Sequence, residues 1–251
     1  MREAGSGKRE ADSPPMYSEE QASSHPASRF PLPASRPTPA EQAMLITGSM
    51  LARERVDFER GMRYGPPLTL ALIVTLVVIY VWQIGSSVGG VGPVLDYALY
   101  RDRVLAGDWY RMLSSAFLHG SPDHLIGNCI SLYILGMACE HALGARGMAL
   151  VYFASALGGA AVSMALSVGP SVGASGAIFG LMGAVVLTLH RHGDRLFMRD
   201  KRIGVVIGVW AGYTLFLGAF TPYIDNGAHL GGLIAGALVA AAVPLRLKLP
   251  A

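Results

Sequence analysis

The sequence predicts an all-α, polytopic membrane protein with six transmembrane helices. Of its 251 residues, 52% are hydrophobic and only 15% are charged, whereas about 25% of the residues in a soluble domain are charged. The apolar residues are also unevenly spread, because they form long runs almost free of charge from residue 68 onward. So many apolar runs cannot all be core helices of one small domain, and they are typical of membrane spans.

Six apolar runs are candidate spans, although some are shorter than the about 20 residues that usually cross a bilayer. A long loop separates the first run from the second and covers residues 85–121. The spans are predicted at residues 68–84, 123–143, 148–167, 175–190, 203–220 and 228–244.

The first part of the chain has a different composition, rich in Pro, Ser, Arg and Glu. Residues 28–37 are Pro-rich and cannot bury enough apolar surface to fold. We therefore expect residues 1–66 to be a disordered cytoplasmic tail and residues 67–251 to be the six-helix membrane domain. Within the tail, residues 41–63 could form a helix on the membrane surface or remain a solvated linker. Residues 1–16 lack the apolar stretch of a cleavable signal peptide, so the first span is expected to direct the chain to the membrane.

Lys and Arg gather in segments that six spans would place on one side of the membrane. These segments are the tail, the turn at Arg146, the loop at residues 191–202 and the C-terminus. The turns after Ser167 and Phe220 contain neither residue type. The positive-inside rule then places both termini in the cytoplasm, and the simple six-span form suggests a bacterial plasma membrane. Basic clusters beside apolar runs, with a net charge of only +3, fit contact with a lipid bilayer and not with nucleic acid.

Four polar side chains lie at the starts of even-numbered spans: His124, Asn128, Ser175 and His229. Even-numbered spans run from the outer to the inner face, so all four residues are expected near the outer face. Polar groups inside a membrane are costly, which makes each of them a candidate functional residue. Their common depth predicts one site built from several helices.

Small residues predict how two of these side chains meet. Small residues lie along the fourth span at Gly173, Gly176, Gly180 and Gly183. In the sixth span, a GxxxG pattern begins at Gly232. Such residues let helix backbones approach closely. A close crossing of the fourth and sixth spans would bring the first residues of these spans within reach of each other.

These residue types suit nucleophilic catalysis. A Ser hydroxyl needs a base to remove its proton, and a His can act as that base. The negative charge that develops on a carbonyl oxygen needs hydrogen-bond donors, which His124, Asn128 and the first N–H groups of the fourth span could supply. Asp225 could orient His229, but a capping role at the helix start is the favoured interpretation. We therefore predict a Ser–His dyad and not a triad.

Four short motifs together resemble the rhomboid family. Each motif alone is weak, but all four occur in order and at the expected span starts, over about residues 66–245. They are GASGAIFG from Gly173, similar to the GxSG box; AHLGGLIAG from Ala228, similar to the AHxxGxxxG box; His119, His124 and Asn128, similar to HxxxxHxxxN; and Gly136, Glu140 and Gly144, similar to GxxxExxxG.

The resemblance implies a six-helix core with a water-filled cavity that opens outward. It implies that Ser175 and His229 form a catalytic dyad, that His124 and Asn128 contribute to the oxyanion site, and that Phe179 stacks on the catalytic His. Gly173 belongs to the same box as the nucleophile and supports it. Family substrates are transmembrane proteins, which are cut in or near their membrane helix without a cofactor.

The loop at residues 85–121 departs from the family pattern. The family usually has Trp-Arg there, whereas this chain has Tyr110 before Arg111. Another aromatic residue keeps the amphipathic character suited to the membrane interface, so only a modest effect is expected. Arg111 and Glu140 are expected to support this loop, and His119 is expected to be a structural, hydrogen-bonded residue.

The predicted function is that of an intramembrane serine endopeptidase, with two alternatives. The first is a catalytically silent rhomboid-like protein that binds membrane clients, although such relatives typically lack the Ser or the His. The second is a transporter or channel with a histidine proton relay, which would require polar residues near the membrane midplane and an internal repeat; the sequence has neither.

Two further features have a less specific explanation. His119 and His124 suggest a metal site, but their spacing is poor for one helix face and no Cys or carboxylate completes the set; we expect no metal. Trp210 and Phe216 in the fifth span could gate substrate entry, but contact with lipid or packing is the favoured explanation.

Overall fold

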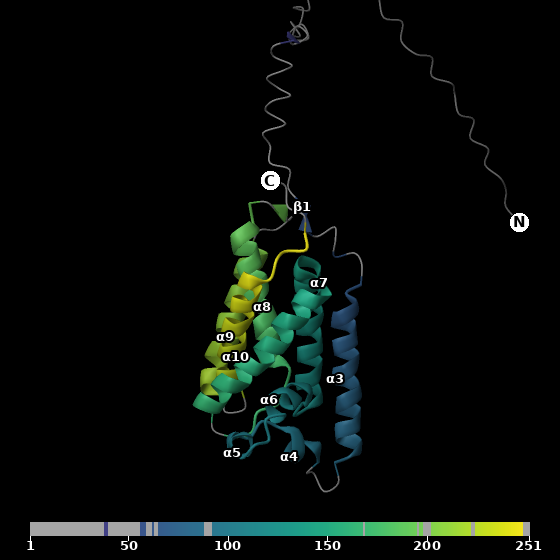
Figure 1. Cartoon of the computed structure of the whole chain (residues 1–251), viewed down its shortest axis with the longest axis vertical. Helices are drawn as coiled ribbons and strands as arrows, with labels where there is room; N and C mark the ends of the chain where they lie inside the picture. The colour runs from purple at the N-terminus through teal and green to yellow at the C-terminus, as the bar shows by residue number, and fades with distance from the viewer. Residues whose placement is uncertain are drawn as a thin grey trace, which may run out of the picture. The chain divides into compact units, whose positions relative to one another are not determined.

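The computed structural model describes residues 38–39, 56–58, 62, 65–87, 92–167, 169–194, 196–197, 202–221 and 224–247. The chain divides into two compact units, Met1–Ala52 and Arg53–Ala251, and nearly all described residues belong to the second. Most of the predicted tail lies outside the described residues, so its disorder stays a prediction. The described part of the second unit is mostly helical (Figure 1).

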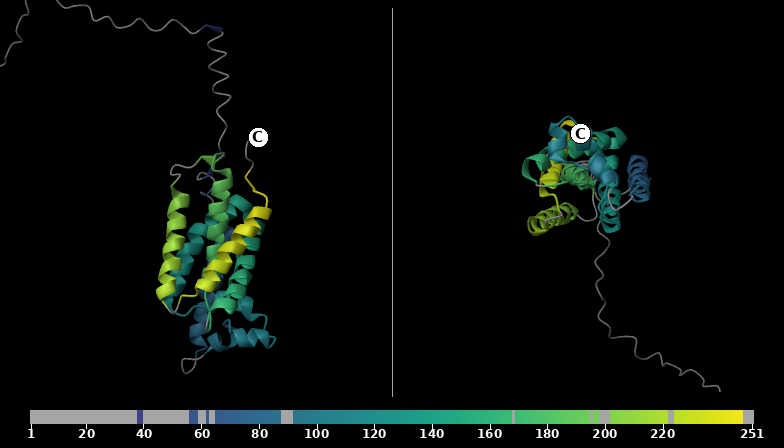
Figure 2. Two further views of the ribbon diagram at one scale, coloured as in Figure 1. Left: turned by 90° about the vertical axis from the view of Figure 1, so that its left-hand side faces the viewer. Right: turned by 90° about the horizontal axis from the view of Figure 1, so that it is seen from below.

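Long helices packed side by side make up the second unit (Figures 1 and 2). The central one is α8, in which every residue from Gly176 to Val185 is buried. Side chains of the neighbouring helices pack against α8 in one buried cluster, and this close packing holds the unit together. The helices are α3 (Pro67–Gly85), α7 (Pro122–Leu166), α8 (Ser175–His192), α9 (Ile203–Phe220) and α10 (Asn226–Ala242).

The longest helix, α7, is interrupted at Gly144, whose backbone is not helical (φ 75°, ψ 168°). Positive φ is strained for residues with a Cβ, so a glycine suits the interruption. The two arms fall on the predicted spans at residues 123–143 and 148–167. By length and apolar composition, only α3 and α7 qualify as candidate spans among the described residues, so the count of six spans stays a prediction.

The loop after α3 folds into short helices held together by Arg111. Its buried guanidinium donates to the carbonyl oxygens of Leu95 (2.9 Å) and Ala98 (3.1 Å) and pairs with the Asp108 carboxylate at 3.0 Å. Tyr110 is about half exposed, and its hydroxyl donates to the Asp96 carbonyl. The prediction that Arg111 supports the loop is therefore confirmed. The elements are α4 (Pro93–Tyr97), α5 (Arg101–Leu105), α6 (Arg111–Ser114) and the 3₁₀ helix η2 (Ser115–Phe117).

Glu140 does not support this loop, and that prediction was wrong. Its carboxylate accepts hydrogen bonds from the backbone N–H groups of Leu68 (3.0 Å) and Thr69 (2.9 Å) and from the Thr69 hydroxyl (2.8 Å). The first N–H groups of a helix have no acceptor within the helix. Glu140 supplies this missing acceptor at the start of α3. It lies near the end of the first arm of α7, more than four helical turns from Pro122, where the loop ends and α7 begins.

A two-residue parallel pairing departs from the predicted all-α class. Strand β1 (Val56–Asp57) pairs with β2 (Leu196–Phe197). The neighbouring Phe58 is buried and packs edge-on against the His141 ring, with 5.2 Å between the centroids. Residues 56–57 are therefore neither a surface helix nor a solvated linker, and most of the remaining residues from 41 to 63 lie outside the described part of the chain.

Helices α8 and α10 cross at glycines on both sides, as predicted. A Cβ added to Gly232 would overlap the backbone of Gly176, and a Cβ added to Gly236 would overlap the backbone of Gly180. Between these four residues no side chain separates the two helices. The backbones can therefore approach more closely than helices with larger residues allow.

We predict that Gly236→Ala lowers the free energy of unfolding by about 1–3 kcal/mol, because the new methyl group has no space against Gly180. The measurement is unfolding of the detergent-solubilised protein. Gly212→Ala is the matched control, since a Cβ at Gly212 on α9 meets no atom within 4 Å. Equal stability of the two variants would contradict a backbone contact at this crossing.

Candidate active site

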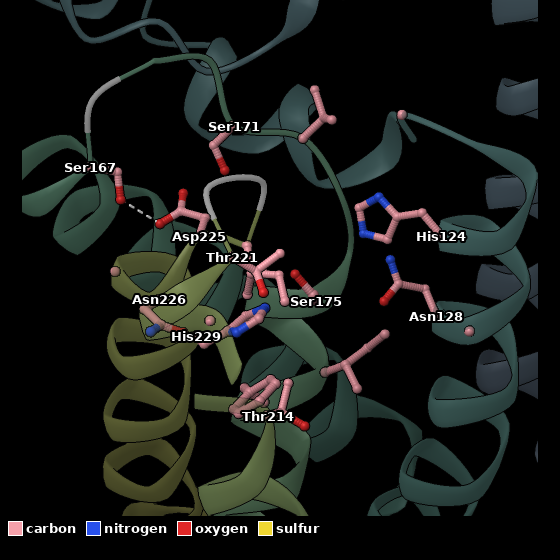
Figure 3. A pocket seen from close by; sticks show the side chains of 18 of the residues that line it. His124, Asn128, Ser167, Ser171, Ser175, Thr214, Thr221, Asp225, Asn226 and His229 are labelled. Carbon is pink, nitrogen blue, oxygen red and sulfur yellow. Dashed lines mark hydrogen bonds between the residues drawn. The ribbon is translucent and has the colours of Figure 1, made fainter. Parts of the chain in front are cut away.

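A pocket of about 1340 Å³ opens among α7, α8, α9 and α10. The four polar residues predicted to share one depth, His124, Asn128, Ser175 and His229, all line it (Figure 3). Three helices thus bring together residues that are about 100 positions apart in the chain. The sequence analysis predicted this meeting, whereas the chemical role of each residue stays a prediction at this point.

Ser175 is the first residue of α8, and the segment before it is held from two sides. The N–H of Gly173 donates to the Ser115 carbonyl at 2.9 Å, while Leu99 and Ser171 exchange two backbone hydrogen bonds of 3.0 and 3.1 Å. Within α8 the first N–H with a helical acceptor belongs to Ile178. The preceding N–H groups are therefore free of intrahelical partners and form a positive end beside the pocket.

His229 lies in the first turn of α10 and is buried. Its ring stacks on Phe179 of α8, with centroids 4.2 Å apart and an interplanar angle of 5°. This is the stacking that the resemblance implied for Phe179. Figure 3 shows the His229 and Ser175 side chains directed into the same part of the pocket. Among the described residues, Nδ1 of His229 has no hydrogen-bond partner.

Asn128 is fixed by His119, which is fully buried. The Asn128 amide donates to Nε2 of His119 at 2.9 Å. Burial, with a smaller contribution from nearby His124, lowers the pKa of His119 to about 4, so its ring is neutral near pH 7 and can accept this bond. Gln83 of α3 hydrogen-bonds both the N–H and the carbonyl of His119. His119 is thus hydrogen-bonded, as expected, whereas its supporting role in the site stays a prediction.

The His124 ring packs against the backbone of Gly173. A Cβ on Gly173 would lie 2.6 Å from Cε1 and 2.8 Å from Nε2 of this ring, and Gly173 has a φ of 125°. Both the space and the backbone conformation therefore require a glycine. Gly173 supports the site by letting the segment before Ser175 pass directly beside His124.

Asp225 is the N-cap of α10, which confirms the capping interpretation. Its carboxylate accepts from the Ala228 N–H at 2.9 Å and from the hydroxyls of Ser167 (2.6 Å) and Ser163. Burial alone would raise the pKa of Asp225, but these bonds, with Ser171, lower it below its usual value. The sequence analysis missed Ser163 and Ser167. Two hydroxyls one turn apart at the end of an apolar run were the available signal.

The two aromatic residues considered for a gate differ in position. Trp210 of α9 lines the pocket, whereas Phe216 does not and is mostly exposed. Among the described residues there is no cluster of three or more His, Cys, Asp or Glu side chains that could hold a metal ion. The pocket instead combines a hydroxyl, an imidazole and several hydrogen-bond donors, which are the groups that acyl transfer requires.

Comparisons with known proteins show which family the chain resembles. The family model described as "Rhomboid domain" matches residues 106–246. The chain is similar to the rhomboid protease GluP of Bacillus subtilis, with 33% identity over 184 residues that cover 72% of this chain and 36% of GluP. It is similar to the rhomboid protease AarA of Providencia stuartii, with 28% identity over 72% of this chain and 75% of AarA. It also resembles a protein named inactive, RHOMBOID-like protein 8 of Arabidopsis thaliana, with 33% identity over 50% of this chain and 35% of that protein.

We predict that Gly173→Ala lowers the free energy of unfolding by about 2–4 kcal/mol, because it combines backbone strain with overlap on the His124 ring. Gly107→Ala is the matched control: Gly107 has a similar φ of 115° but no atom within 4 Å of an added Cβ, so only strain of about 1 kcal/mol is expected. Unfolding in detergent compares the two. A loss in Gly173→Ala no larger than in Gly107→Ala would mean that the contact with His124 does not constrain this position.

Proposed function

Because the chain belongs to the rhomboid family, we propose that it is an intramembrane serine endopeptidase that cleaves transmembrane proteins in or near their membrane segments. The family is one of integral membrane proteins. One observation carries the proposal: Ser175 and His229 line the same pocket, at the glycine-lined crossing of α8 and α10. Stacking on Phe179 keeps the imidazole plane in one orientation beside α8.

The proposed reaction is acyl transfer through a Ser–His dyad. Oγ of Ser175 attacks the scissile carbonyl carbon while His229 accepts the hydroxyl proton. The tetrahedral intermediate collapses when His229 gives that proton to the leaving amine, and an acyl-enzyme on Ser175 remains. Water then attacks the acyl group, with His229 again as base, and releases the carboxylic acid product and the free serine.

The oxyanion would be stabilised by donors that are already in place. One hydrogen of the Asn128 amide is used by His119, which fixes the amide plane and leaves the second hydrogen available. The imidazole of His124 and the backbone N–H groups at the start of α8 are further donors. Donors that are already in place stabilise the developing charge without the cost of rearrangement during the reaction.

The contacts of Asp225 support a dyad and not a triad. The carboxylate is occupied by the Ala228 N–H and by serine hydroxyls, while Nδ1 of His229 has no partner among the described residues. The plane of the imidazole ring is therefore set by stacking on Phe179 and not by a bond to a carboxylate.

The proposal includes six membrane spans, with both termini in the cytoplasm of a bacterium and the pocket near the outer face of its plasma membrane. The distribution of Lys and Arg supports the orientation. The two arms of α7 together with α3, α8, α9 and α10 supply six helical segments at the predicted ranges. The substrates would be transmembrane proteins reaching the pocket from the bilayer. The alternative, a silent relative that only binds such proteins, would have no need for both Ser175 and His229.

We predict that Ser175→Ala and His229→Ala each reduce cleavage to the background, because one variant lacks the nucleophile and the other its base. The measurement is cleavage of a model transmembrane substrate by purified protein in detergent. Unfolding of each variant in the same detergent is the control, and Ser175→Ala should unfold like the wild type. Cleavage that survives in Ser175→Ala would disprove the assignment of the nucleophile.

Asn128→Ala should have a smaller effect, with kcat reduced by roughly 10²–10³-fold, because His124 and backbone N–H groups remain as donors. The same cleavage assay gives kcat and KM, and KM should change little because the lost bond forms only in the transition state. A loss as complete as that of Ser175→Ala would show that Asn128 has a different role.

A further inference from the structure

Asp225 joins three parts of the chain at the mouth of the pocket. It begins α10, and its carboxylate accepts from Ser163 and Ser167 at the end of α7. Figure 3 shows the Ser171 hydroxyl directed toward the same carboxylate, from the segment that leads to Ser175. The two helices and the segment before the proposed nucleophile therefore meet at one side chain.

The same residue fixes the backbone at His229. The carbonyl oxygen of Asp225 accepts the N–H of His229 at 3.1 Å, while its carboxylate accepts the N–H of Ala228 at 2.9 Å. Both bonds belong to the first turn of α10. Loss of the side chain would leave a helix-terminal N–H without its partner and would loosen the turn that carries the proposed base.

The surroundings leave this turn little room to move while the contact is intact. A Cβ on Gly227 would lie 3.0 Å from Cα of Ser163 and 3.1 Å from Oγ of Ser167, and a Cβ on Gly159 of α7 would lie 2.8 Å from the Ala228 carbonyl oxygen. The start of α10 thus packs directly against α7. Asp225 supplies the side-chain hydrogen bonds at this contact.

The charge of Asp225 is balanced by hydrogen bonds and not by a cation. Among the described residues that line the pocket there is no Lys or Arg; the other titratable ones are Asp123, His124 and His229. The carboxylate is surrounded by the hydroxyls of Ser163, Ser167 and Ser171 and by the N-terminus of α10. Its contribution is therefore to hold these parts of the chain together. An amide of the same shape would keep part of these contacts.

We propose that Asp225 is a positioning residue. It holds the first turn of α10 on Ser163 of α7 and on Ser167, the residue after α7, and so places His229 beside Ser175. This inference rests on the proposed function for its link to catalysis, but the seating of α10 can be tested without any activity. Asp225 acts through the backbone of His229 and does not touch the reacting atoms.

The test compares Asp225→Ala, Asp225→Asn and the double variant Ser163→Ala/Ser167→Ala with the wild type. We expect Asp225→Ala to lower kcat and the rate at which a fluorophosphonate labels Ser175 by roughly 10–100-fold, as for a reacting group held slightly out of place, with KM changed less than about threefold. Asp225→Asn should retain most of the wild-type kcat and labelling rate. The double variant should have values between those of Asp225→Ala and Asp225→Asn. Asp123→Asn is the matched control, because Asp123 is a second, exposed carboxylate on the same pocket.

Amide hydrogen exchange at residues 226–230 gives the readout that needs no activity, and it should be faster in Asp225→Ala than in Asp123→Asn. Wild-type kcat and labelling in Asp225→Ala, or an equal loss in Asp123→Asn, would overturn the inference. If Asp225→Ala does not fold, the double variant replaces it, and wild-type kcat and labelling in the double variant would then overturn the inference. If the wild type neither cleaves nor labels, the proposed function fails, whereas unchanged exchange at residues 226–230 would overturn the positioning role by itself.

Discussion

The backbone contact between α8 and α10 is the constraint on which the rest of the site depends. Gly176 and Gly180 of one helix lie against Gly232 and Gly236 of the other, with no space for a Cβ at either glycine of α10. Because both helices begin at the pocket, this contact sets the separation of the proposed nucleophile from its base. The stacking of His229 on Phe179 follows from it, since the two rings belong to the two helices.

The pocket is held firmly on one side and more loosely on the other. The segment before Ser175 is bonded to Leu99 and Ser115 of the preceding loop, and that loop is organised by the buried Arg111. On the opposite wall, α9 contributes Trp210 to the pocket, but Ala211 is its one buried hydrophobic residue among those described. Few buried contacts within the protein therefore hold this wall of the pocket.

Much of the site could be predicted from the sequence, because its residues stand out locally in apolar runs and because consecutive spans alternate in direction. Polar residues at equivalent ends of apolar runs predicted that His124, Asn128, Ser175 and His229 meet, and closely spaced glycines predicted which helices cross. The partners of Glu140 could not be predicted in this way, since they depend on which helix start lies beside it. The same holds for Ser163 and Ser167, whose acceptor is about 60 residues away, and for β1, which pairs with a segment about 140 residues later.

The most direct measurement is identification, by peptide mass spectrometry, of the residue that a fluorophosphonate modifies in the detergent-solubilised protein. The pocket offers other serine hydroxyls at Ser121, Ser131, Ser167 and Ser171, so the position of the adduct distinguishes an activated serine from one that is merely accessible. The account predicts an adduct on Ser175 alone, and none on Ser175 when His229 is replaced by Ala. An adduct on one of the other serines, or labelling of Ser175 that does not depend on His229, would contradict it.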